Sequence, residues 1–210
     1  MNRLSIFFLF FSSAVFAQEK DFQIWSKIQL KHELNKQLTL TATEGFRLRE
    51  NASLPSKLFT NFSLGYSPSK KFRLAAGVRF INVFELDQKT NFRFRGYLDL
   101  ILKKKAKRTR IYYRGRLQHQ EVSDYFEQYC RNKFSFSHNL RKTPLEPFFS
   151  TEIFYDINNV NIDKLRYTLG FSYPLSKNLE LDFYQKIQRE INSPKPKSLY
   201  ILGFGLAYRL

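Results

Sequence analysis

The most constraining feature of this sequence is an alternation of apolar and polar residues along almost the whole chain. In residues 72–80, for example, apolar side chains occupy the even positions, while Arg73, Gly77 and Arg79 stand at odd ones. Successive side chains of a β-strand point to opposite faces, so a period of two predicts strands with one apolar face and one polar face. The pattern recurs in eleven segments: 22–31, 38–43, 58–66, 72–80, 92–102, 111–117, 131–140, 149–155, 165–173, 179–187 and 200–210. No segment shows a convincing helical period.

Polar connections separate these segments at a nearly regular spacing. Short turns fall at Asn35-Lys36, Ser69-Lys70, Lys104-Lys105, Arg141-Lys142 and Ser176-Lys177. Between them lie longer connections at 50–57, 85–91, 120–128, 158–163 and 190–197. Short turns that alternate with longer loops are typical of an outer-membrane barrel, with the turns in the periplasm and the loops outside.

The predicted fold class is therefore all-β: an antiparallel, up-and-down transmembrane β-barrel of ten to twelve strands, of which eleven are counted. Bacterial single-chain barrels have even strand numbers, so we expect ten or twelve. Aromatic residues make up 17% of the chain, and those near strand ends are expected to form interfacial girdles. The expected girdle residues are Trp25, Tyr66, Phe72, Phe149, Tyr155, Tyr173 and Tyr208. A periplasmic or secreted β-barrel is the alternative.

The N-terminus has the pattern of a secretory signal peptide. A single charge at Arg3 precedes an apolar run from Leu4 to Val15, and small residues at Val15 and Ala17 fit a cleavage site before Gln18. We expect residues 1–17 to be a cleaved signal peptide and residues 18–210 to form one domain in the outer membrane of a Gram-negative bacterium. An uncleaved N-terminal anchor is the alternative.

The charge balance is strongly basic. The chain has 35 Lys and Arg against 18 Asp and Glu, a net charge of +17. Expected export argues against nucleic acid as the partner and favours outer-membrane lipids and small anions. One Cys and three His leave little material for a disulfide framework or a zinc cluster, and no cofactor motif is present.

Charged residues on the polar faces predict a belt inside the barrel. Counted from the nearest short turn, they fall at comparable heights on neighbouring strands. The belt consists of Arg79, Arg95, Arg114, Arg131, Glu152 and Arg166. One interpretation is a packed network in which Asp99 and Asp182 also pair with cations, giving a plugged structural or adaptor barrel. The other is a narrow, anion-preferring passage or binding site.

Two further features bear on function. Glu44 falls on the apolar parity, and a bulge before Gly45 is expected to return it inward. The three histidines, His32, His119 and His138, lie on the apolar parity without the spacing of a nucleophile–base pair, so we expect no enzymatic activity. A lipid-modifying enzyme is the less favoured alternative. The basic run at 103–108 fits either a solvated turn or contact with anionic headgroups.

Dispersed residues along the predicted domain also resemble a known family. They are Trp25, Arg47, Arg49, Tyr112-Tyr113-Arg114, Arg131, Pro147-Phe148-Phe149 with Glu152, Arg166-Tyr167 and Gly170. The pattern is similar to the bacterial family called domain of unknown function 2490, whose members resemble small outer-membrane barrels and are frequent in Bacteroidota. The resemblance implies architecture and location but brings no biochemical activity.

Overall fold

The computed structural model describes residues 20–87, 89–122 and 125–210. The predicted signal peptide, residues 1–17, lies outside the described residues. Eleven strands make up the fold: β1 (Lys20–Glu33), β2 (Leu38–Arg49), β3 (Leu54–Ser69), β4 (Phe72–Phe84), β5 (Thr90–Ala106), β6 (Thr109–Val122), β7 (Tyr125–His138), β8 (Glu146–Asp156), β9 (Asn161–Pro174), β10 (Leu179–Glu190) and β11 (Ser198–Arg209). No helix in the described part of the chain is long and apolar enough to cross a membrane.

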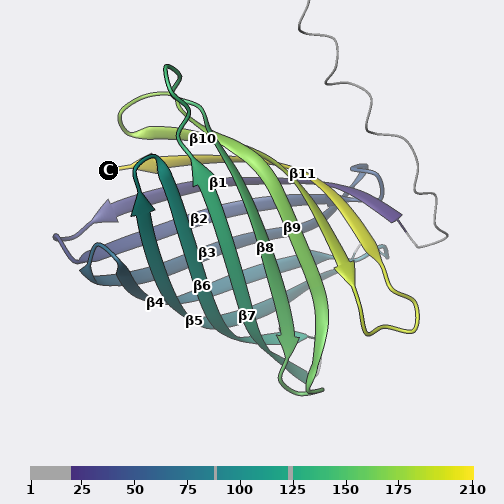
Figure 1. Cartoon of the computed structure of the whole chain (residues 1–210). Helices are drawn as coiled ribbons and strands as arrows, with labels where there is room; N and C mark the ends of the chain where they lie inside the picture. The colour runs from purple at the N-terminus through teal and green to yellow at the C-terminus, as the bar shows by residue number, and fades with distance from the viewer. Residues whose placement is uncertain (1–19, 88, 123–124) are drawn as a thin grey trace, which may run out of the picture.

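The eleven strands close into a single barrel, as Figure 1 shows. Each strand pairs antiparallel with its neighbour in sequence, but β1 pairs parallel with β11, from Lys20 opposite Ser198 to Lys31 opposite Arg209. The predicted barrel and the count of eleven are confirmed. The expectation of an even number was wrong, because it assumed that every pair is antiparallel. When every neighbouring pair is antiparallel, the first and last strands run in opposite directions, and the number of strands is even. When the first and last strands pair in parallel, as β1 and β11 do, the number of strands is odd.

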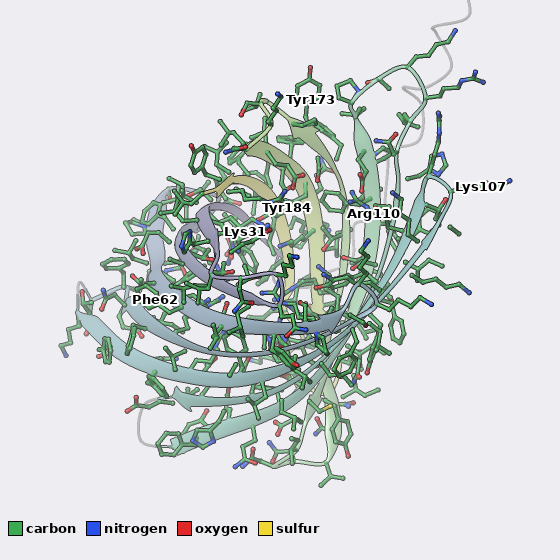
Figure 2. The ribbon with its side chains drawn as sticks, turned by 90° about the vertical axis from the view of Figure 1, so that its left-hand side faces the viewer. Lys31, Phe62, Lys107, Arg110, Tyr173 and Tyr184 are labelled. Atoms are coloured by element: carbon green, nitrogen blue, oxygen red, sulfur yellow. The ribbon has the colours of Figure 1, made fainter. Side chains whose placement is uncertain are left out.

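The two faces of the barrel wall differ sharply in chemistry. On β5, Leu98, Leu100 and Leu102 are exposed on the outside, while Asp99 and Ile101 are buried on the inside. Phe62 on β3 is likewise exposed on the outer face (Figure 2). The apolar parity of each strand therefore faces outward, and the polar parity lines the lumen.

Glycines on the inner face make room for aromatic rings that lie against the wall. A Cβ added at any of these glycines would overlap a ring from a neighbouring strand. The pairs are Gly45 with Phe59, Gly77 with Tyr97 and Gly203 with Tyr184. Because each ring covers a position without a side chain, its bulk stays at the wall and the centre of the lumen remains available.

The connections at the two ends of the barrel are similar in length, which corrects the expected contrast between short turns and long loops. We call the end where β1 begins the N-terminal rim; it carries the segments 50–53, 85–87 with 89, 157–160 and 191–197, while residues 88 and 123–124 lie outside the described residues. The C-terminal rim carries the connections 34–37, 70–71, 107–108, 139–145 and 175–178. Strand pairing continues into most of the segments expected to be loops, so both rims have connections of two to seven residues.

Side-chain oxygens stabilise two of the connections at the C-terminal rim. Asn35 Oδ1 accepts hydrogen bonds from the backbone N–H groups of Gln37 and Leu38, both at 2.8 Å. Ser176 Oγ accepts from the N–H of Leu179 at 3.1 Å. Such local acceptors explain why polar residues mark these turns in the sequence.

Glu44 does not turn inward as expected. The register between β2 and its neighbours runs unbroken through Gly45, and the irregularity lies later, between Arg47 and Leu48. Glu44 therefore stays exposed on the outer face, where its carboxylate accepts a hydrogen bond of 2.7 Å from the hydroxyl of Thr60.

The parallel seam predicts which outward-facing residues can be cross-linked. Ile28 lies opposite Leu206, so an Ile28→Cys, Leu206→Cys pair in a Cys130→Ser background should form a disulfide upon oxidation. The control pair Ile28→Cys, Leu202→Cys is offset by four residues, about 13 Å along the strands, and should stay reduced. Gel mobility with and without reductant measures both. Cross-linking of the control pair alone would contradict the seam.

Candidate functional site

The barrel encloses a cavity of about 700 Å³ to which all eleven strands contribute. Its lining begins near the N-terminal rim with Gln23, Ser56 and Leu199 and reaches Lys31 and Lys103 near the C-terminal rim. Along β1 alone, Gln23 and Lys31 are separated by roughly 20 Å along the barrel axis. The cavity therefore extends through most of the height of the wall.

Positive charge dominates the described residues that line this cavity. Fifteen are Lys or Arg, and three are Asp or Glu. The cations are Lys27, Lys31, Arg47, Lys57, Arg73, Arg79, Arg95, Lys103, Arg114, Arg116, Arg131, Lys133, Lys164, Arg166 and Lys186; the acids are Asp99, Glu127 and Glu152. Such a surplus inside a narrow, partly dehydrated lumen favours the entry of anions.

One group of cations shares a buried carboxylate. Glu152 on β8, with 5% of its side chain exposed, forms salt bridges with Arg114 and Arg131, each at 2.8 Å, and with Arg166 at 3.2 Å. Arg166 lies directly opposite Glu152 in the ladder between β8 and β9. These contacts tie together strands β6 to β9 through the lumen.

Asp99 and Asp182, the two acids expected to pair, both do so. Asp99 accepts two hydrogen bonds from Arg116, at 2.6 and 2.7 Å, and the same guanidinium lies 3.7 Å from the centre of the Tyr97 ring. Asp182 contacts Lys27 at 3.2 Å.

We call the set Asp99, Arg114, Arg116, Arg131, Glu152 and Arg166, on β5 to β9, the acid arc.

On β10 and β1 to β4, three further cations lie against aromatic rings and form no salt bridge in the described part of the chain, whereas Arg166 of the acid arc lies both near Glu152 and 5.4 Å from the Trp25 ring. Arg47 lies 3.7 Å from the centre of the Trp25 ring, and Arg79 lies 4.1 Å from that of Phe59. Lys186 lies 4.1 Å from the Tyr184 ring. We call the set Trp25, Arg47, Phe59, Arg79, Tyr184 and Lys186, on β10 and β1 to β4, the ring arc.

The ring arc leaves its charge uncompensated. Within the described part of the chain, no Asp or Glu forms a salt bridge with Arg47, Arg79 or Lys186. A ring face attracts a cation through its quadrupole but carries no net charge of its own. The rings therefore fix the positions of these cations without cancelling their charge.

All six residues of the predicted belt line the cavity; five of them belong to one of the two arcs, and Arg95 belongs to neither. Four, including Glu152, belong to the acid arc, and Arg79 belongs to the ring arc. Arg95 lies opposite Arg79 in the ladder and donates a hydrogen bond to Gln120. The Nε atoms of Arg95, Arg114 and Arg131 are buried and make no hydrogen bond with any described residue.

The belt predicted from the sequence does not include Arg47 or Lys186, and Trp25 was not predicted to face the lumen. Trp25 was expected in an interfacial girdle, but it points into the lumen and is 6% exposed. Its parity, which it shares with Gln23 and Lys27, was the signal that could have placed it inside. A lumenal Trp next to cations has a different function from a girdle Trp, because it contacts charge rather than headgroups.

Metal-binding side chains do not gather in the described part of the chain. None of its His, Cys, Asp and Glu side chains form a group of three or more that could hold a metal ion. His119 stacks on Phe126, with ring centres 4.5 Å apart, and His138 contacts the hydroxyl of Thr109 at 3.0 Å.

The two rims differ in charge although not in length. The five connections of the C-terminal rim contain eight Lys or Arg and no Asp or Glu. Those of the N-terminal rim contain three Lys and four Asp or Glu in sequence. Figure 2 shows Lys107 at the tip of the β5–β6 hairpin, which projects from the C-terminal rim. One mouth of the lumen is therefore far more basic than the other.

A comparison with protein families matches residues 22–198 to the family described as protein of unknown function (DUF2490). The chain belongs to the DUF2490 family. The resemblance predicted from the sequence is confirmed over most of the chain, and the match covers β2 to β10 in full. No curated protein gives a significant match.

The salt bridges of Glu152 predict a strong effect on stability. Glu152→Gln leaves three guanidinium groups without their carboxylate and should lower the free energy of unfolding by about 3–5 kcal/mol. Glu44→Gln, the same change on the outer face, should cost less than about 1 kcal/mol, because it alters one exposed hydrogen bond. Urea unfolding in detergent measures both. Equal costs would show that the salt bridges of Glu152 do not stabilise the barrel.

Proposed function

We propose that this DUF2490 barrel is an outer-membrane protein whose lumen binds small anions and lets them pass. The observation that carries the proposal is the cavity that reaches from one rim toward the other with fifteen cations and three acids in its described lining. A low-dielectric wall with fixed positive charges raises the local concentration of anions and excludes cations. The basic C-terminal rim adds a wide positive field at one mouth.

The outer wall supports placement in a membrane. Its mid-wall residues are exposed and apolar, such as Leu98 at 60% and Leu169 at 63%. Twelve residues, the length of β10 and β11, rise about 30 Å when tilted by the usual angle of a barrel strand, which matches a hydrocarbon core. The expected signal peptide is consistent with export. A soluble barrel of this kind would present an extensive apolar surface to water.

A second candidate function is a structural or adaptor barrel that conducts nothing. The acid arc favours it, because the salt bridges of Glu152 join four strands across part of the lumen. An eleven-stranded barrel lies between the eight strands that side chains fill and the sixteen or more of wide porins. Conductance separates the two candidates.

The membrane placement predicts a depth-dependent cost of charge. Leu169 lies in the middle of the outer wall, so Leu169→Arg should lower the free energy of unfolding by about 2–4 kcal/mol in lipid vesicles. Leu175→Arg, in the connection 175–178 at the C-terminal rim, should cost about 0–1 kcal/mol, although Leu175 is also exposed, at 51%. Equal, small costs for both changes would indicate a barrel that is surrounded by water.

The anion preference predicts the sign of a reversal potential. Reconstituted protein in a tenfold KCl gradient should give the anion-selective sign, and Lys31→Glu together with Lys57→Glu should reduce or invert it, since both line the lumen. The control, Lys107→Glu with Arg108→Glu, makes the same charge change on the projecting hairpin and should have a smaller effect. Folded wild-type protein without single-channel steps would exclude passage and favour the structural barrel.

A further inference from the structure

The three cations of the ring arc lie close to one another. Arg47 and Arg79 share the Phe59 ring, with their guanidinium carbons 5.3 and 4.1 Å from its centre, so they are no more than about 10 Å apart. Arg47 and Lys186 in turn share the Trp25 ring, at 3.7 and 5.1 Å from its centre. One compact stretch of wall thus presents three positive groups to the cavity.

Neighbouring polar groups keep this stretch in place. Arg79 Nε donates a hydrogen bond of 3.3 Å to Asn61 Oδ1, and the hydroxyl of Tyr97 donates to the same oxygen at 3.1 Å. Tyr184 packs over Gly203 of β11, and Trp25 of β1 lies opposite the same glycine. Asp182, on the same strand as Tyr184, is held in a salt bridge with Lys27. The cations are therefore positioned before any ligand arrives, which lowers the entropy lost on binding.

We propose that the ring arc is a binding site for a small phosphate compound that carries two or more negative charges; this inference rests on the proposed anion-binding lumen. A monovalent anion would leave most of the charge of Arg47, Arg79 and Lys186 uncompensated. A phosphate group offers several oxygens in a tetrahedral array, which guanidinium forks and an ammonium group can approach from different strands. The cavity of about 700 Å³ is of the size that holds a small molecule.

The acid arc explains why the ligand binds on one side of the lumen. Its arginines already share the carboxylates of Asp99 and Glu152, so a phosphate there must compete with fixed negative charge. No carboxylate forms a salt bridge with the three cations of the ring arc in the described part of the chain, although Arg166 of the acid arc shares the Trp25 ring with Arg47 and Lys186. The acid arc thus has four arginines with two carboxylates, whereas the ring arc has three cations with none, and the anion should bind to the ring arc.

Trp25 provides a direct reporter of this site, because it is the only Trp of the chain. Folded wild-type protein in detergent is titrated with inorganic pyrophosphate at constant ionic strength, and the heat of binding and the Trp emission are followed together. We expect saturable binding and a saturable change in emission, since Arg47 lies directly on the ring. KCl at matched ionic strength should give neither. Pyrophosphate that gives no saturable heat would overturn the site, and heat without a change in Trp emission would place binding elsewhere.

A double variant tests the cations themselves. Arg47→Gln with Arg79→Gln should raise the Kd for pyrophosphate at least about tenfold, because it removes two charged hydrogen-bond donors. Arg141→Gln with Lys142→Gln, at the C-terminal rim, removes the same charge and should leave the Kd within about twofold. An unchanged Kd in the first variant would overturn the site. If that variant does not fold, the titration of the wild-type protein still decides.

Two comparisons complete the test. Citrate, a polycarboxylate, should bind more weakly than pyrophosphate, and equal affinity would overturn the preference for phosphate. The reversal potential tests the proposed passage independently of the site. Anion selectivity without pyrophosphate binding would overturn the ring arc alone. Binding at Trp25 without conductance would overturn the passage alone.

Discussion

Closure of the strand ring through one parallel seam is the constraint on which the rest of this structure depends. The seam between β1 and β11 pairs the edges that an open sheet would leave, so every strand has two neighbours. Closure also fixes an inside and an outside for every strand. Because the apolar parity covers the outside, the polar parity and its many arginines must share a narrow lumen.

Because the cations are confined to a narrow lumen, the partner of each one decides how much of its positive charge remains uncompensated. Where Glu152 and Asp99 are present, four arginines form salt bridges with two carboxylates, and part of their charge is cancelled. Where Trp25 and Phe59 take their place, the cations lie against ring faces and keep their full charge. The same barrel thus combines a wall that stabilises with a wall that attracts anions. The basic C-terminal rim extends this attraction to one mouth only.

Most of the fold could be predicted from the sequence, whereas the candidate site could be predicted only in part. The parity of Arg79, Arg114 and Glu152 predicts that they face the lumen, and all three line the cavity, because parity is a local property of a strand. It could not show that Arg114 and Glu152, which are 38 residues apart, form a salt bridge while Arg79 meets a ring. Glu44 shows the opposite error: a bulge was expected to move it inward, yet the regular ladder keeps it on the outer face.

By itself, the sequence determined the eleven strands, the faces of their side chains and membership of the DUF2490 family, because these depend on a period of two and on residue identities along the chain. Only the tertiary structure decided that β1 and β11 run parallel, that the rims differ in charge but not in length, and that Trp25 contacts Arg47. The physical reason is the same in each case. Closing the ring brings together residues from distant strands, and the local pattern contains no information on which of them will meet.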